Sequence, residues 1–79
     1  MTEQYSNYII IIKQHLRNNW GNDLFPGFSV KLDFDENDQP VTVFTGTIQD
    51  QAELFGILMR LSNLNLQLVS INKVSDDKN

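Results

Sequence analysis

The sequence predicts an α+β domain of the ferredoxin-like order βαββαβ, in which a four-stranded antiparallel sheet carries both helices on one face. A run of β-branched residues and a region of strict alternation indicate strands, and a capped segment with apolar residues at helical spacing indicates a helix. A chain of 79 residues has room for one core, because it buries only roughly 60 to 65% of the surface that its unfolded form exposes. Residues 1–79 are therefore read as one domain, with an N-terminal segment at 1–7 and a polar tail at 75–79.

The first predicted strand is the apolar run Tyr8 to Ile12, which holds four successive isoleucines. β-Branched side chains lose rotamer freedom in a helix and pack well on a pleated strand. A helix from Tyr5 to Asn18 is the alternative, because Tyr5, Tyr8, Ile9, Ile12 and Leu16 also fall on one helical stripe. The strand is the interpretation on which the fold depends.

A short helix or helical loop is expected between Leu16 and Pro26, where Asn and Gly are too frequent for a long helix. Its apolar face would consist of Trp20, Leu24 and Phe25. Pro26 and Gly27 then end this segment and start the next strand.

The segment from Phe28 to Asp35 alternates apolar and polar residues throughout, which is typical of a strand with one buried face. This pattern predicts that Phe28, Val30, Leu32 and Phe34 face a core. Turn-forming residues at 36–39 and a β-rich run at 41–47 predict a hairpin, followed by a turn out of the sheet around Gly46.

A helix is predicted from Gln51 to Asn63, with Asp50 as its N-cap and Glu53 as the capping-box partner. The Asn63-Leu64-Asn65 turn ends it, and the last strand follows from Leu66 to Val74. Gly56 inside the helix suggests close packing against a neighbouring element.

Composition argues against several functions. The net charge is −4 with six scattered Lys and Arg, so neither nucleic acid nor an anionic membrane is an expected partner. The chain has no cysteine, which suits a reducing compartment, and the cytoplasm is the expected location. His15 is the only histidine and reads as an exposed residue at a strand end. The acidic run from Asp33 to Asp38 has Asp where a calcium loop needs Gly. No metal site, cofactor or catalytic residue is predicted, and an enzyme is not expected.

From His15 onward the chain resembles a group of small bacterial proteins of unassigned function. The resemblance covers about three quarters of the chain and rests on Trp20, Phe25-Pro26-Gly27, Thr45-Gly46 and the block Asp50-Gln51-Ala52-Glu53-Leu54-Phe55-Gly56-Ile57-Leu58, followed by a leucine-rich turn and a final strand. It implies a strand at the isoleucine run and supplies no activity. Phe55 stands where such relatives often carry His.

A weaker similarity is to ACT domains, which are small-molecule-sensing modules of the same plan. Asp50 and Leu54 match the strand-to-helix junction of those modules, while the junction here lacks their Gly. The similarity implies a regulatory ligand-binding domain as the alternative function.

The function expected first is a non-enzymatic protein-interaction module, as a homodimer or with another protein. An isoleucine run puts apolar side chains on both faces of its strand, whereas helices cover one face. The candidate ligand or partner surface lies around the loop and the helix start, at Trp20, Phe25, Gly27, Thr45, Gly46, Asp50 and Gln51.

Overall fold

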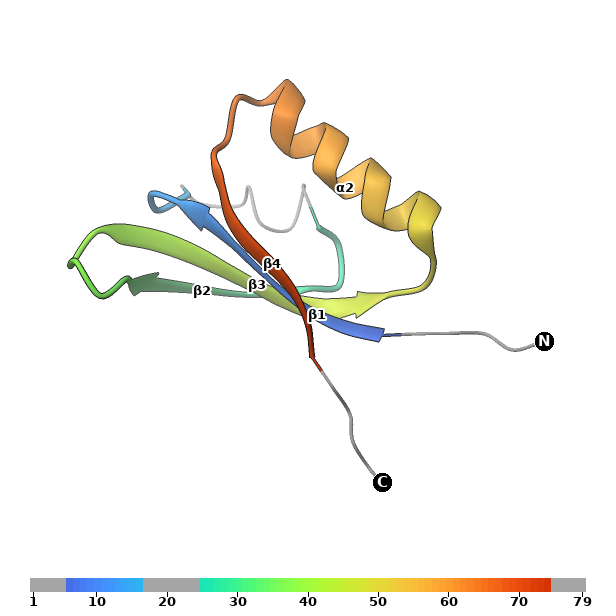
Figure 1. The fold of residues 1–79 in the computed structure, drawn as a ribbon, viewed down its shortest axis with the longest axis horizontal. Coiled ribbons are helices and arrows are strands. Elements are labelled where there is room, and N and C mark those ends of the chain that lie inside the picture. Colours follow the sequence, from blue (N-terminus) through green and yellow to red (C-terminus); the bar gives the residue numbers. More distant parts are fainter. Residues whose placement is uncertain (1–5, 17–24, 75–79) are drawn as a thin grey trace.

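The fold is α+β in a computed structural model that describes residues 6–16 and 25–74. Four strands form one antiparallel sheet, and the described residues include a single helix. The elements are β1 (Ser6–Lys13), β2 (Ser29–Phe34), β3 (Pro40–Ile48), α2 (Gln51–Asn63) and β4 (Leu68–Val74). Figure 1 shows α2 over one side of the sheet, which we call the helix-side face; the opposite side, the open face, carries no described element.

The isoleucine run is extended, which confirms the predicted strand and shows that the alternative helix from Tyr5 to Asn18 is wrong over its described part. β1 lies inside the sheet, because the strand order is β2-β3-β1-β4 and β1 pairs antiparallel with both of its neighbours. Successive side chains of a strand point to opposite faces. Ile10 and Ile12 are therefore fully buried on the helix-side face, while Ile9 and Ile11 lie partly exposed on the open face.

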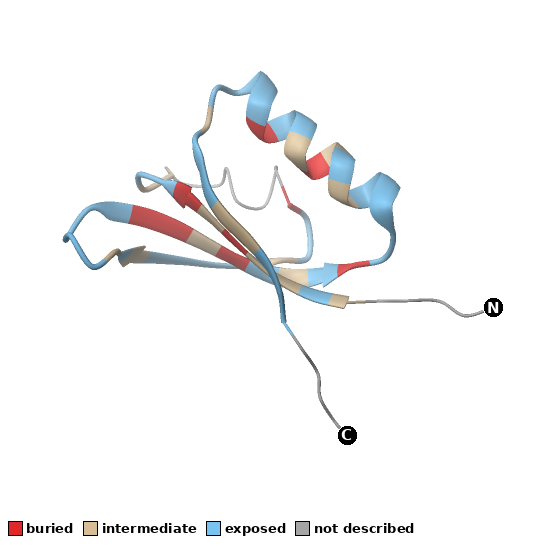
Figure 2. Ribbon diagram, in the orientation of Figure 1, coloured by how far each residue is buried: buried red, intermediate tan, exposed pale blue. Residues whose placement is uncertain are grey.

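The core lies between α2 and the sheet, where the buried residues of both layers face one another (Figure 2). Ile57 and Leu61 of α2 pack with Ile10, Ile12, Phe44 and Ile48 of the strands. Phe25 completes this cluster, with its ring edge-on to Phe44 at a centroid distance of 4.3 Å. The short helix expected between Leu16 and Pro26 falls largely on residues 17–24, outside the described part of the chain; of its expected apolar face, Phe25 is described and buried.

The predicted hairpin is present, and Phe28 packs against the core as predicted. The burial predicted for Val30, Leu32 and Phe34 is wrong. Val30, Leu32 and Phe34 do share the helix-side face, because they stand opposite Phe44, Thr42 and Pro40 of β3. Their exposed fractions are nevertheless 42%, 52% and 57%. The reason is position in the sheet: β2 is an edge strand, and the described helix does not cover it.

The turn between β2 and β3 explains the acidic run. The side-chain Oδ1 of Asp35 accepts from the backbone N–H groups of Asn37 (2.8 Å) and Gln39 (2.9 Å). The Asp38 N–H donates to the Asp35 carbonyl, and Asp38 has the left-handed backbone of a bulged hairpin turn (φ 63°). Asp35 therefore organises the turn, and the neighbouring acids lie in solvent.

Both ends of α2 match the sequence prediction. Asp50 Oδ1 accepts from the Glu53 N–H at 2.9 Å, and Glu53 Oε1 accepts from the Gln49 N–H at 2.8 Å. At the other end Asn65 adopts φ 61°, and the Leu66 N–H donates to the Leu61 carbonyl. This is a Schellman ending in which Asn takes the place usually held by Gly. β4 begins two residues later than expected, at Leu68, and its pairing with β1 shifts register between Ile11 and Ile12.

A buried hydroxyl fixes the path of the chain where β1 ends. Gln14 has a left-handed backbone (φ 69°), which is unfavourable for a residue with a side chain. Thr42, fully buried in β3, donates its hydroxyl to the Gln14 carbonyl (2.7 Å) and accepts from the Leu16 N–H (3.1 Å). The hydroxyl therefore acts as both donor and acceptor, and the two hydrogen bonds hold the left-handed turn at Gln14.

Replacing Thr42 with the nearly isosteric valine should lower the free energy of unfolding by about 1 to 3 kcal/mol, because it leaves the Gln14 carbonyl and the Leu16 N–H without their partner. Urea denaturation followed by circular dichroism measures this. Thr45→Val is the matched control, since Thr45 is exposed on the same strand and should change stability by no more than about 0.5 kcal/mol. Equal effects of the two substitutions would contradict this role for Thr42.

Candidate functional site

The residues proposed from the sequence as a ligand or partner surface lie in different environments. Phe25 is in the core, and Gly27 forms an exposed turn with φ 88°. Thr45 is exposed on the open face, whereas its neighbour Gly46 lies on the helix-side face. Asp50 is engaged as the N-cap and Gln51 is the exposed first residue of α2; Trp20 lies outside the described residues. The structure does not unite the described members in one cleft.

Gly46 has a packing role within β3, where the sequence suggested a turn out of the sheet. It stands on the helix-side face, and the Phe28 ring lies directly over it. A Cβ at this position would lie 2.6 Å from two atoms of that ring. An aromatic side chain covering a strand glycine in this way compensates for the packing that the glycine lacks. Gly46 therefore serves the packing of the sheet, as the position over which the Phe28 ring lies.

Gly56 is different, because a Cβ added there would meet no described atom within 4 Å. The close packing that the sequence suggested for this glycine is therefore not seen among the described residues. Phe55 and Met59, which lie one turn apart beside it, are exposed by 58% and 63%.

The two glycines give a matched pair of substitutions. Gly46→Ala should destabilise the protein by about 1 to 3 kcal/mol, because the packed Phe28 ring must move. Gly56→Ala should stabilise it by up to about 1 kcal/mol, because alanine favours the helix. Thermal unfolding of both variants tests this, and a stabilised Gly46→Ala protein would show that the ring yields freely.

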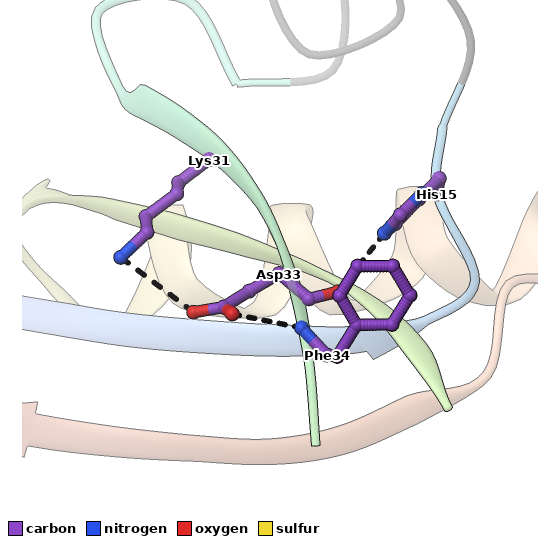
Figure 3. Close-up of polar contacts among 4 residues, drawn as sticks. All are labelled: His15, Lys31, Asp33 and Phe34. Carbon is purple, nitrogen blue, oxygen red and sulfur yellow. Dashed lines mark hydrogen bonds and ion pairs between the residues drawn. The ribbon is translucent and has the colours of Figure 1, made fainter. Parts of the chain in front are cut away.

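The single histidine joins a small cluster at the end of β2 (Figure 3). His15 is half-buried, which corrects the expectation of an exposed side chain. Its Nε2 lies 2.9 Å from the Asp33 carbonyl, and its ring meets the Phe34 ring edge-on at 5.1 Å. This arrangement holds the chain after β1 against β2, and both partners of His15 belong to the sheet.

Asp33 in the same cluster is partly exposed and carries two interactions. Its Oδ1 accepts from the Phe34 N–H at 2.8 Å, and its Oδ2 lies 3.5 Å from Lys31 Nζ. The hydrogen bond from Phe34, followed by the charge of Lys31, lowers the pKa of the Asp33 carboxyl. A carboxyl whose pKa falls on folding favours the folded state above its unfolded pKa, and that contribution disappears as the pH drops through the folded pKa. Contact of the Asp33 carboxyl with solvent keeps the effect small.

A polar cleft of about 250 Å³ lies at the end of the sheet where three loops meet. It is lined by Lys13, Gln14, Gln39, Pro40, Asn65 and Gln67. The Gln14 N–H donates to the Pro40 carbonyl (2.7 Å) and the Lys13 N–H to the Gln67 carbonyl (2.9 Å), so the backbone walls are fixed. Sequence reasoning missed this cleft, because it depends on the left-handed turn at Gln14, a residue type that gives no signal for such a turn.

Apolar side chains remain exposed or partly exposed on both faces of the sheet. On the open face Ile9, Ile11 and Val43 lie side by side in the middle of the sheet and are partly exposed. On the helix-side face Val30, Leu32 and Phe34 form an uncovered row along β2. Scattered apolar residues are ordinary on a protein surface, whereas contiguous ones mark contact sites.

These features define a small α+β domain whose described part exposes apolar surface on both faces of its sheet. The chain belongs to the family described as a domain of unknown function (DUF8691), whose profile matches residues 7–72. No curated protein matches the chain. Within the described residues there is no helix long and apolar enough to cross a membrane, and no group of three or more metal-ligating side chains.

Proposed function

We propose that the chain is a non-enzymatic protein-interaction module that acts as a homodimer. One observation carries the proposal: the sheet presents apolar side chains on both faces, and the single described helix covers only part of one face. Burying apolar surface contributes about 25 cal/mol per Å², so an exposed contiguous patch favours association. The contact uses the open face or an edge strand of the sheet.

The strand order supports a finer proposal, that the complete fold is the ferredoxin-like βαββαβ plan. β1 lies between β3 and β4, and all three strand pairings are antiparallel, as that plan requires. The plan also needs a helix between β1 and β2, on the side of the sheet that α2 occupies. Most of the segment between β1 and β2, residues 17–24, lies outside the described part of the chain.

Sedimentation velocity at concentrations from about ten to several hundred micromolar tests the homodimer, because a weak symmetric contact shows itself only as a concentration-dependent mass. The expected result is a monomer–dimer equilibrium, with an average mass that rises toward twice 9.1 kDa. A protein that remains a monomer over the whole range would contradict the proposal.

The polar cleft supports a second candidate, an ACT-like regulatory domain that binds a small molecule. Its lining offers one ammonium group and four side-chain amides, which suit a small polar ligand bearing a carboxylate. The cleft does not include the Asp50 helix start on which the ACT similarity rests, so the similarity and the cleft point to different places.

A thermal-shift screen with free amino acids tests this alternative, since a ligand that binds only the folded state raises the unfolding midpoint. Gln67→Ala should reduce such a shift if the cleft is the binding site. Absence of any shift at millimolar ligand would count against the ACT-like function, and a shift unchanged in Gln67→Ala would place the ligand elsewhere.

A further inference from the structure

Alternate residues of the edge strand β2 direct their backbone N–H and C=O groups either toward β3 or outward from the sheet. The Asp35 N–H donates to the Gln39 carbonyl at 2.9 Å, so these two residues form a hydrogen-bonded pair. Bonded and non-bonded pairs alternate along an antiparallel ladder. Ser29, Lys31 and Asp33 therefore bond to β3, while the N–H and C=O groups of Val30, Leu32 and Phe34 point outward from the sheet.

Two further observations agree that the Phe34 backbone groups point outward. Pro40 stands opposite Phe34 and has no N–H with which to form a bonded pair. The Phe34 N–H is instead bonded to the carboxylate of Asp33, which closes one end of the edge. Val30 and Leu32 have no such side-chain partner among the described residues, which leaves their outward groups available to another strand.

The side chains of β2 form a pattern that is complementary to itself when two copies of the strand pair antiparallel about Leu32. Along the strand they read Val30, Lys31, Leu32, Asp33 and Phe34. A two-fold axis through Leu32 places Val30 opposite Phe34 of a second copy, and Lys31 opposite Asp33 of that copy. All apolar side chains then meet on the helix-side face, and both ion pairs form on the open face.

We propose that two copies of the chain dimerise through antiparallel pairing of their β2 edges about Leu32, with Lys31 of each copy opposite Asp33 of the other. The inference rests on the proposed homodimer and names its surface. In the new ladder the outward-pointing residues Val30, Leu32 and Phe34 form the hydrogen-bonded pairs. Lys31 and Asp33 therefore face each other at non-hydrogen-bonded positions, where cross-strand side chains lie closest. On pairing, the Asp33 carboxylate leaves the Phe34 N–H, which bonds to Val30 of the second copy.

The other edge of the sheet is less suited to the same role. The register between β1 and β4 shifts between Ile11 and Ile12, so the pairing of β4 is interrupted at one point. β2 pairs with β3 without interruption from Ser29 to Phe34. Irregular edges resist pairing with another strand, whereas flat continuous edges accept it.

Charge reversal at the two paired positions tests the arrangement. Lys31→Asp and Asp33→Lys each bring like charges together twice in the dimer, and each should weaken dimerisation by about tenfold. The double variant Lys31→Asp/Asp33→Lys restores opposite charges, so its dissociation constant should return to within about threefold of the unmodified chain. Sedimentation velocity measures all three, with circular dichroism as the check of folding.

Lys73→Asp is the matched control, because it makes the same charge change on the exposed edge strand β4 and should leave dimerisation unchanged. Leu32→Pro provides a second test: it removes an outward N–H and spares the ladder to β3, so the protein should fold and fail to dimerise. If the dimer persists in Leu32→Pro, or if the double charge variant is no tighter than the single ones, the β2 arrangement is wrong.

Failure of the homodimer and failure of its assignment to β2 give different results. A chain that stays monomeric overturns both. If the β2 variants do not weaken the dimer but Ile11→Asp disrupts it, the homodimer is supported and its contact surface is the open face.

Discussion

The structure depends on the extended conformation of the isoleucine run. β1 is the strand to which both β3 and β4 pair, and without it the sheet separates into the β2–β3 hairpin and an isolated strand. Its isoleucines also explain the surface, because alternation sends two of them into the core and two to the open face. One strand therefore accounts for both the core of the protein and its exposed apolar centre.

The sequence predicted those elements whose determinants are local. The limits of α2 followed from Asp50, Glu53 and the asparagine-rich turn, because capping depends on residues within one turn of each helix end. The β2–β3 hairpin followed from strict alternation and a cluster of turn residues. Burial along β2 was predicted wrongly, since alternation tells which residues share a face and does not tell whether anything covers that face.

The candidate site was harder to predict for the same reason. Phe25 and Gly46 were chosen for their residue types, and the structure uses them for packing, with Phe25 in the core and Gly46 beneath Phe28. The role of Thr42 depends on a partner 28 residues away in sequence, and no pattern within β3 signals it. The charge symmetry of β2 is visible in the sequence, but it acquires meaning only once the strand is known to lie at an edge.

The most direct test of the account is the solvent exposure of the isoleucine methyl groups in dilute protein. In NMR spectra of isoleucine-methyl-labelled chain, a soluble paramagnetic agent should broaden the signals of Ile9 and Ile11 and spare those of Ile10 and Ile12. This result is expected because only the helix-side face of β1 is covered. Equal protection of all four isoleucines would show that the open face is covered in the monomer, and would contradict the account of a sheet with an exposed apolar face.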